Sequence, residues 1–413
     1  MPRFQRRIVV TGMGAISALG LSAPATFEAS LEGRGGILDH EFDPGPNGPA
    51  PVTMPCALAP GDVVAATEEA LGRRIGGSVD LFSLFALKAA REALDQAGLV
   101  VDGDLGDRAA VVLGHGFAGI HSLETAYERF FGQRTFKVHP MTVPRVMVSA
   151  PASAVAMEFG IRGPVFATSS ACASSGHAIA QGAALIDSDQ AEVAVVGGAE
   201  AIATPACLRA WQALGAISAA PCRPFSSGRD GMTVGEGGGA MVLETLEHAR
   251  ARGARPIAEL AGTGMSSDAF HWTQPSLEGA CAAMRGALEG ADVVDESELL
   301  ISAHGTGTPL NDKNEAAALR AIFGERFRDH PVIATKSAHG HLIGAASVVQ
   351  GVIGILALEA RTAPPVLNYL GPDPDCDLEL VLGAARPIGA DVLLLNAFAF
   401  GGLNCSLVFR RWT

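Results

Sequence analysis

Short apolar runs, rich in β-branched residues, alternate along this chain with longer stretches in which apolar residues recur at helical spacing. Most of the short runs are apolar throughout instead of alternating with polar residues, which is typical of strands covered by helices on both faces. The pattern therefore predicts an α/β fold. The strands we expect are residues 7–10, 109–113, 193–196, 240–244, 257–262, 299–303, 332–335, 378–382, 392–397 and 406–409.

Helical spacing is clearest from Phe82 to Ala97, and the next residue, Gly98, is suited to a left-handed helix cap. The longest apolar stretch, 342–360, contains three glycines, a serine and a glutamine. It therefore predicts a buried central helix better than it predicts a membrane span. Further helices are expected at residues 173–186, 279–289, 314–323 and 342–359.

The domain organisation follows from length and from the order of these elements. A chain of 413 residues exceeds what one hydrophobic core usually serves, and the predicted elements follow a similar order in its two halves. We expect a duplicated fold, with an N-terminal half at residues 1–252 and a C-terminal half at residues 253–413. The charged segment 247–256 is the predicted junction.

Composition narrows the function. The net charge of −13 argues against a nucleic-acid partner, because phosphate binding needs a basic face. The seven cysteines are scattered, odd in number and form no CxxC pair, so we expect reduced thiols and no metal. The basic first residues lead into a predicted strand instead of an apolar export segment, which predicts a cytoplasmic location.

Cys172 is the candidate nucleophile. The segment 163–180 reads as a strand, a sharp turn and a helix, with small residues on both sides of Cys172. A thiol at a helix N-terminus faces partial positive charge, which favours the thiolate, and free backbone N–H groups there can stabilise an oxyanion. A small buried cysteine in a helix rich in Ala and Ser fits this segment equally well. His177 is interpreted as a packing residue.

Two loops centred on histidines tip the balance towards a catalytic site. His304 follows the predicted strand 299–303, while Lys336 and His341 follow the predicted strand at 332–335. A third, Gly-rich loop ends near Asn404. Open α/β folds place their sites where such loops gather at strand ends. Neutral imidazoles can stabilise the enolate left when a malonyl thioester loses CO2, and an ammonium nearby supplies fixed charge. Asp312 and Glu315 are available to balance that charge.

These segments together resemble, essentially end to end, the β-ketoacyl-acyl-carrier-protein synthases of the type II class. Some of them, such as the segment Asp373-Pro-Asp-Cys-Asp-Leu, also resemble nodulation-type and other specialised synthases. The motifs that carry the resemblance are Thr-Ser-Ser-Ala-Cys172, His304-Gly-Thr-Gly-Thr, Lys336-Ser-Ala-His-Gly-His341, Phe400-Gly-Gly, Cys222-Arg-Pro-Phe-Ser, Gly235-Glu-Gly-Gly-Gly and Gly264-Met-Ser-Ser-Asp-Ala-Phe-His.

The resemblance implies a thiolase-like fold of two βαβαβαββ halves in α/β/α/β/α layers. It implies that an acyl group on Cys172 condenses with a malonyl thioester on an acyl carrier protein. It also implies a homodimer, or alternatively a heterodimer, and no cofactor beyond the carrier's phosphopantetheine. The residue roles it implies are acyl acceptor for Cys172, decarboxylation pair for His304 and His341, supporting charge for Lys336, oxyanion hole for the N–H groups of Cys172 and Phe400, extender gate for Phe400, and pantetheine contacts for Thr306, Thr308 and Thr273.

Some positions depart from the family pattern. Phe117 stands where this family commonly has an aliphatic residue lining the acyl pocket, so we expect it to shorten or bend that pocket. Ser302 and Gln350 stand where cation-holding members tend to have Asn and Glu, which predicts no metal. The basic carrier-docking stretch is reduced to Arg73 and Arg74.

Three other classes of protein are weighed against this interpretation. A dinucleotide-binding enzyme is disfavoured because Gly12-x-Gly14 lacks the third glycine. A degradative thiolase would need a second reactive cysteine, for which Cys405 is the candidate. A non-catalytic partner of a heterodimeric synthase, of the chain-length-factor kind, would lack the nucleophile, so Cys172 argues against it.

Overall fold

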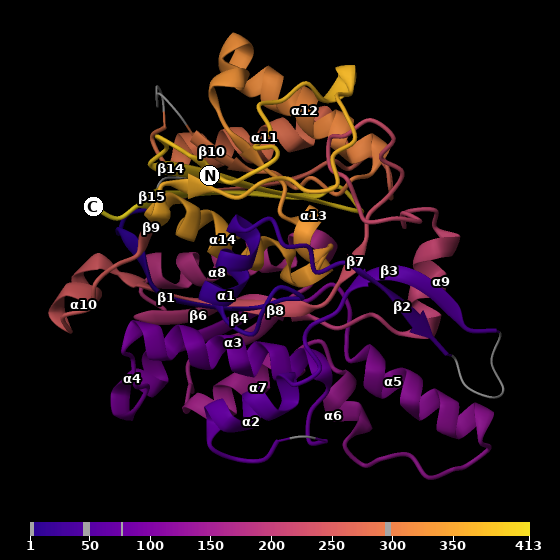
Figure 1. Cartoon of the computed structure of the whole chain (residues 1–413). Helices are drawn as coiled ribbons and strands as arrows, with labels where there is room; N and C mark the ends of the chain where they lie inside the picture. Colours follow the sequence, from indigo (N-terminus) through magenta and orange to yellow (C-terminus); the bar gives the residue numbers. More distant parts are fainter. Residues whose placement is uncertain (1–3, 44–49, 76, 294–298) are drawn as a thin grey trace.

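The architecture has five layers, in the order helix, sheet, helix, sheet, helix, in a computed structural model of the chain (Figure 1). The structure describes residues 4–43, 50–75, 77–293 and 299–413. Within these residues the main strands form one 10-stranded hydrogen-bonded sheet. This sheet folds over at its middle, so that its two ends lie in separate layers (Figure 1).

The N-terminal half contributes five strands to the sheet, in the spatial order β5-β4-β6-β8-β1. Strands β5 and β6 run parallel to β4, and β8 runs antiparallel to both β6 and β1. Their bounds are β1 Ile8–Ile16, β4 Ala109–Gly114, β5 Val165–Thr168, β6 Val193–Glu200 and β8 Gly237–Thr245.

The C-terminal half repeats this arrangement in the order β11-β10-β14-β15-β9. When the five strands of each half are numbered one to five along the chain, both halves have the same spatial order, 3-2-4-5-1. The halves join where Ile8 of β1 pairs antiparallel with Leu260 of β9. The expected duplicated βαβαβαββ architecture is confirmed. The bounds are β9 Ala258–Ser267, β10 Leu299–Ser302, β11 Val332–Ile333, β14 Val392–Ala399 and β15 Leu403–Arg411.

Two long helices lie in the central layer, packed against each other and against both parts of the sheet: α8, Ser174–Asp187, and α14, Ala346–Ala360. Helices α3 and α7 cover the outer face of the N-terminal half, and α11 and α12 cover that of the C-terminal half (Figure 1). These outer helices are α3 Leu81–Ala97, α7 Ala150–Phe159, α11 Leu277–Gly290 and α12 Pro309–Phe323.

Shorter elements complete the fold. The charged junction predicted at 247–256 contains α10 and the loop that leads to β9. The short helices are α1 Ala23–Leu31, α2 Val63–Leu71, α4 Gly103–Arg108, α5 Ile120–Tyr127, α6 Thr142–Val146, α9 Pro205–Ala213, α10 Leu246–Ala251 and α13 Lys336–His339. The short strands are β2 Leu38–Phe42, β3 Val52–Ala57, β7 Val234–Gly235, β12 Thr362–Ala363 and β13 Arg386–Pro387.

The long apolar segment lies at the centre of the molecule, as its glycines and polar residues predict. Residues 343–360 are long and apolar enough to cross a membrane, yet 83% of this window is buried inside the protein. Gly354 lies against Leu393 of β14 so closely that an added Cβ would come within 2.6 Å of it. This helix is therefore the shared core of the two halves.

The glycines that resemble a dinucleotide fingerprint have a packing role. A Cβ at Gly12 would lie 1.9 Å from the carbonyl oxygen of Ala93, and one at Gly14 would lie 2.2 Å from that of Ala89. Both glycines let α3 approach β1 closely. Gly98 caps α3 with φ 59°, as predicted.

One predicted strand is not formed, and several others differ from the structure in their ends. Residues 378–382 form only isolated bridges, at Leu380 to Val332 and at Leu382 to Val366, because this segment follows the outer edge of β11 and turns at Leu378. Strand β14 is longer than predicted and continues to Ala399, since its pairing with β15 extends to the turn at residues 400–402.

Candidate active site

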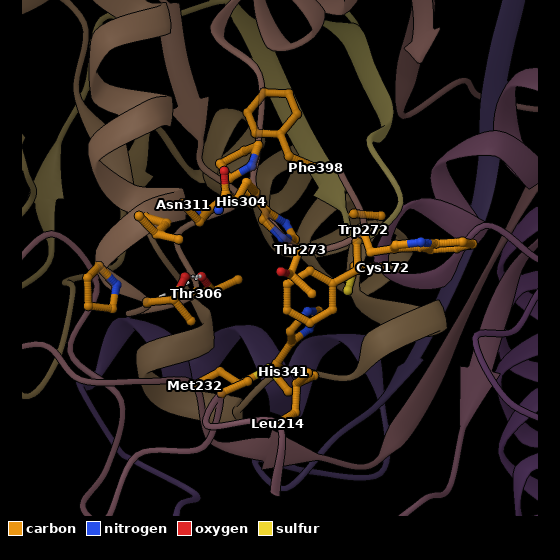
Figure 2. A pocket seen from close by; sticks show the side chains of 18 of the residues that line it. Cys172, Leu214, Met232, Trp272, Thr273, His304, Thr306, Asn311, His341 and Phe398 are labelled. Atoms are coloured by element: carbon orange, nitrogen blue, oxygen red, sulfur yellow. Dashed lines mark hydrogen bonds between the residues drawn. The ribbon is translucent and has the colours of Figure 1, made fainter. Parts of the chain in front are cut away.

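Loops from both halves meet around one cavity of about 370 Å³. Cys172 follows β5, His304 follows β10, His341 lies between α13 and the central helix α14, and Phe400 lies in the β14–β15 turn. All four line the cavity. Figure 2 shows Cys172 and His341 on one side of the hollow and Thr306 on the other. One donor atom each from Cys172, His304 and His341 lie within 4.8 Å of one another.

The turn that carries Cys172 is a single 3₁₀ turn, Ala171–Ala173, between β5 and α8. Ala171 has φ 49°, a left-handed conformation that costs a non-glycine residue about 1 kcal/mol. Ser174 holds the turn in place: its hydroxyl accepts the Ser170 N–H at 2.8 Å and donates to the Ala171 carbonyl at 2.6 Å. The local backbone therefore presents the thiol at the tip of a constrained turn.

His177 ties this turn to the second half of the molecule. Its Nε2 donates to the Asn404 carbonyl at 3.3 Å, so its Nδ1 accepts from the Ser170 hydroxyl at 2.5 Å. Burial lowers the pKa of His177, which keeps the ring neutral and this pair of hydrogen bonds intact. The packing role predicted for His177 is thus extended by two specific contacts.

The Cys172 thiol is 6% exposed, and burial raises its pKa to about 11, against the opposing charge of Lys336. The prediction that a helix terminus would favour the thiolate is therefore wrong for the resting protein. Helix α8 begins only at Ser174, and the loss of hydration at the sulfur outweighs the helix end. The backbone N–H groups of Phe400 and Cys172 itself point at the sulfur.

Hydrogen bonds determine which ring nitrogen carries the proton in His304 and in His341. The backbone N–H of Ile343 donates to Nδ1 of His341 at 3.2 Å, so the proton of His341 resides on Nε2. The Lys336 ammonium lies 3.4 Å from Nδ1 of His304, which places that ring's proton on Nε2 as well. His341 Nε2 is buried and has no hydrogen-bond partner among the described residues.

Both rings are neutral at physiological pH. Burial lowers the pKa of His304 and of His341 well below its usual range, and the nearby Lys336 charge lowers each further. The ring centroids are 5.5 Å apart and nearly perpendicular. The site thus holds two neutral N–H donors and a thiol in one water-poor cavity, an arrangement suited to an oxygen that becomes negative.

Lys336 fastens the two histidine loops to each other. It is fully buried, and its Nζ donates to the His304 carbonyl at 2.5 Å and to Oε1 of Gln350 at 2.7 Å. The amide nitrogen of Gln350 donates in turn to the Ala303 carbonyl at 2.6 Å. Burial lowers the pKa of Lys336. The Gln350 side chain, at a position considered for a cation, therefore serves the ammonium.

Asp312 and Glu315 hold the backbone of the loop after His304. Glu315 accepts the N–H groups of His304 and Gly305, at 2.8 and 2.9 Å. Asp312 accepts those of Thr306 and Gly307, at 3.1 and 3.3 Å. Burial raises the pKa of both carboxyls, and their charges favour the Lys336 ammonium from a distance. Asp312 and Glu315 therefore position the loop after His304, in addition to the charge balance that was predicted for them.

The three predicted pantetheine-contact threonines all line the cavity. The hydroxyls of Thr306 and Thr308 lie 2.8 Å apart, and Thr273 lies beside Trp272, which is 82% exposed. Phe117 does not line this cavity. Its ring centroid lies 6.0 Å from that of Trp211, which does line the cavity and which the sequence pattern did not single out.

Cys405 does not support a degradative thiolase. Its side chain is fully buried against Gly176 and is not among the residues that line the cavity. The sulfur and two imidazoles of the main site have donor types that bind zinc. The expectation that no metal is held there stays a prediction: with Nδ1 of each ring facing Lys336 or the Ile343 N–H, Nε2 carries the proton and offers no lone pair to a metal.

A duplicated α/β scaffold that gathers a thiol, two neutral imidazoles and an ammonium at strand ends is that of a thiolase-like condensing enzyme. The family model "Beta-ketoacyl synthase, N-terminal domain" matches residues 5–249, and "Beta-ketoacyl synthase, C-terminal domain" matches residues 257–370. The chain belongs to the β-ketoacyl synthase family and is an enzyme of that family.

Relatives match over nearly the whole chain. Nodulation protein E of Rhizobium sp. (strain N33) is 40% identical over 98% of this chain and 99% of its own length. The 3-oxoacyl-[acyl-carrier-protein] synthase 2 of Staphylococcus aureus (strain N315) is 33% identical, with the same coverage of both chains. A solved structure described as the ishigamide ketosynthase/chain length factor aligns with TM-score 0.91 and 32% identity, covering 99% of this chain and 100% of its own.

Another solved structure, described as AntDE:AntF (apo), a type II PKS acyl-carrier protein in complex with its ketosynthase bound to the hexaketide, aligns with TM-score 0.85 and 28% identity. It covers 99% of this chain and 100% of its own. The chain-length-factor alternative is not favoured, because the nucleophile and both imidazoles are present and share one cavity.

Proposed function

We propose that this enzyme catalyses the decarboxylative Claisen condensation of an acyl group held on Cys172 with a malonyl thioester on an acyl carrier protein. The β-ketoacyl carrier thioester that results would serve fatty-acid, polyketide or specialised lipid elongation. The observation that carries the proposal is the meeting of the Cys172 sulfur with two neutral imidazoles within 4.8 Å.

The first step is acyl transfer. The sulfur of Cys172 attacks the carbonyl carbon of the incoming acyl thioester, and a carbon–sulfur bond forms to give a tetrahedral oxyanion. The N–H groups of Cys172 and Phe400, which converge at the sulfur, stabilise this oxyanion. The bond to the carrier sulfur then breaks, and the proton of the Cys172 thiol passes to that leaving sulfur. The thiol loses its proton as it attacks, because the thiolate is the nucleophile, and the exchange is neutral overall since that proton ends on the leaving sulfur.

The second step is decarboxylation. The thioester oxygen of the malonyl group accepts hydrogen bonds from Nε2 of His304 and of His341. The bond to the carboxylate carbon breaks, CO2 leaves, and its electron pair forms an enolate on that oxygen. Neutral donors suit this step since the enolate stays a strong nucleophile. Lys336 positions the donors by holding Nδ1 and the backbone carbonyl of His304.

The third step forms the product. The enolate carbon attacks the carbonyl of the acyl group on Cys172, a carbon–carbon bond forms, the carbon–sulfur bond to Cys172 breaks, and the leaving sulfur takes up a proton from solvent. The same N–H groups of Cys172 and Phe400 hold the second oxyanion. Thr306, Thr308 and Thr273, which line the cavity, would bind the pantetheine arm of the carrier. Phe400 would gate the extender end.

We propose a second copy of this chain as the structural partner, with a heterodimer as the alternative. Strand β5 pairs only with β4 and leaves its other edge free among the described residues. Helix α6 contacts α7, and α7 contacts β5. These elements carry exposed apolar side chains, among them Val143 and Met157, which are 67% and 79% exposed. An apolar face beside a free strand edge suits a second, antiparallel β5.

The carrier protein must dock near the cavity mouth. Arg73, one of the basic residues considered for this task, forms a salt bridge with Glu158, so it contributes little free charge. Sequence relatives named 3-oxoacyl-[acyl-carrier-protein] synthase, together with a structural relative in complex with a carrier, support a carrier as substrate donor.

Intact-mass analysis after exposure to an acyl-carrier thioester tests the proposal. A mass gain of one acyl group in the wild type, absent in Cys172→Ala, is expected. Adding malonyl carrier should then release CO2 and give a β-ketoacyl carrier. If the wild type takes up no acyl group, the chain is a silent partner instead. Light scattering with and without a charged residue at Met157 tests the dimer: Met157→Asp should give monomers.

A further inference from the structure

The two substrates must reach the Cys172 sulfur from different directions. The cavity mouth, lined by Thr306, Thr308 and the exposed Trp272, is the route for the carrier arm that brings the extender. The acyl chain already on Cys172 must lie elsewhere during condensation, since the extender occupies that route. Phe400, whose N–H points at the sulfur, and Trp211, which stacks on it, form one aromatic part of the cavity lining.

Trp211 closes this side of the cavity. It lies on α9, is 8% exposed, and lines the same cavity as Cys172. Its ring stacks on Phe400, with centroids 6.2 Å apart and planes inclined by 28°. Behind it, the Phe117 ring lies 6.0 Å away and is tilted by 59°. The three rings form a continuous aromatic wall, of which Trp211 is the central member.

The region behind this aromatic wall is polar and is unsuited to an aliphatic chain. The carboxylate of Glu200 is fully buried and accepts the N–H groups of Gly116 and Phe117, at 2.7 and 3.3 Å. It also accepts the Gly344 N–H at 2.9 Å, which ties this corner to the second half. Glu200 therefore fixes the backbone of Phe117 and resists displacement of its ring.

One turn before Trp211 on the same helix, Cys207 lies among acidic groups. Its backbone N–H donates to Oε1 of Glu124 at 3.2 Å. Burial raises the pKa of its thiol to about 12, and the charges of Glu124, Glu200 and Glu236 act in the same direction. An alkyl tail that passed Trp211 would strip water or hydrogen bonds from these carboxylates, which is costly. The wall thus marks a boundary between an apolar and an acidic region.

We propose that Trp211 is the specificity-determining residue that limits the acyl group on Cys172 to a short chain, with Phe117 bracing it from behind. This inference rests on the proposed condensing function. It assigns the limiting contact to Trp211, which touches the cavity, and gives Phe117 a supporting position one ring further from the sulfur.

Acylation of Cys172 by straight-chain acyl-pantetheine thioesters, from acetyl to dodecanoyl, measures the limit. Rates are followed by intact mass in the wild type, Trp211→Ala, Trp211→Phe and Phe117→Ala. Trp272→Ala is the matched control, because it removes the same ring type from the mouth of the same cavity. The readout is the ratio of long-chain to short-chain acylation rates, so a general loss of activity through a loosened Phe400 does not confuse it.

In the wild type we expect the rate to fall steeply beyond short chains. Trp211→Ala should raise the long-to-short ratio about tenfold or more, the effect of burying roughly two further methylenes. Trp211→Phe and Phe117→Ala should raise it less, and Trp272→Ala should leave it unchanged. An unchanged ratio in Trp211→Ala, an equal rise in Trp272→Ala, or a wild type that accepts dodecanoyl as readily as butanoyl would overturn the proposal. If no thioester acylates Cys172 at all, it is the proposed function that fails.

Discussion

The two halves of this enzyme contain the same local device at the same place. In each half a 3₁₀ turn after the third strand leads directly into a helix of the central layer: Ala171–Ala173 before α8, and Ile343–Ala345 before α14. In the C-terminal half the short helix α13 lies between the third strand and the turn. Each turn begins with a non-glycine residue in the left-handed region, Ala171 at φ 49° and Ile343 at φ 40°.

The residue after the strained position differs between the halves. In the N-terminal half it is Cys172, whose thiol faces the cavity; in the C-terminal half it is Gly344, whose N–H donates to Glu200. A Cβ at Gly344 would come within 2.2 Å of the Gly116 nitrogen, so no side chain fits there. The duplicated scaffold supplies a constrained turn twice, and one residue decides whether the turn bears a nucleophile or joins the halves.

The largest expected effect removes the nucleophile of the first turn. Cys172→Ala should abolish acyl transfer and condensation, while malonyl decarboxylation persists because His304 and His341 are unchanged. Product analysis and CO2 release, measured on the same sample, separate the two activities. If Cys172→Ala still condenses, the N-terminal turn has no catalytic role.

The converse change removes a histidine of the C-terminal half and should impair decarboxylation only. His341→Ala should lower decarboxylation about 10²–10³-fold, the usual effect of removing one oxyanion donor, while Cys172 is still acylated. Acylation by mass and CO2 release are again the readouts, with His139→Ala as a control at an exposed histidine outside the cavity lining. Equal losses of both activities would show that the halves do not divide the chemistry.

The reactivity of the Cys172 thiol and the rate of decarboxylation should depend on pH in opposite directions. Burial raises the pKa of Cys172 to about 11, so alkylation of its thiol by iodoacetamide should rise about tenfold per pH unit between about pH 7 and 9. Burial lowers the pKa of Lys336 to about 8. Decarboxylation should therefore fall as the pH rises through about 8, because the ammonium is lost. Peptide mass spectrometry and CO2 release give the two profiles.

On the acid side, decarboxylation should stay constant to well below pH 6.5, because His304 and His341 remain neutral there. A loss of activity centred near the ordinary histidine pKa would contradict the neutral-donor assignment. Lys336→Met, which removes the titrating group, should abolish the alkaline fall while lowering the overall rate.

The smallest effect on catalysis is expected from the strained residues themselves. Ala171→Gly relieves the left-handed strain but frees the unfolded chain, so stability should change by no more than about 1 kcal/mol. Ile343→Gly relieves the same strain yet loses a side chain that is 1% exposed, which should cost about 2–5 kcal/mol. Chemical denaturation compares the two. Equal changes would mean that the buried side chain of Ile343 adds nothing to stability beyond the backbone strain that the two turns share.

Much of this architecture was predictable from the chain alone. Fully apolar strands, the capped helix 81–97 and the central helix near 343–360 follow from periodicity and from glycine placement, which are local properties. The motif residues Cys172, His304, Lys336 and His341 were predicted as one site, since each follows a strand of an open α/β fold.

Other features depended on contacts between distant segments. The raised pKa of Cys172 arises from burial by elements of both halves, which overrides the helix end nearby. The tautomers of His304 and His341 depend on Lys336 and on a backbone N–H supplied by Ile343. Trp211 belongs to an unremarkable short helix, and only its stacking between Phe400 and Phe117 places it at the wall of the cavity.

The amino-acid order thus determined the elements, their duplication and the chemical groups, because propensity, period and turn chemistry act over a few neighbouring residues. Tertiary structure decided the protonation states, the loop-holding role of Asp312 and Glu315, and the shape of the acyl wall. These depend on desolvation and on hydrogen bonds across the seam between the halves, where residues far apart along the chain share one water-poor space.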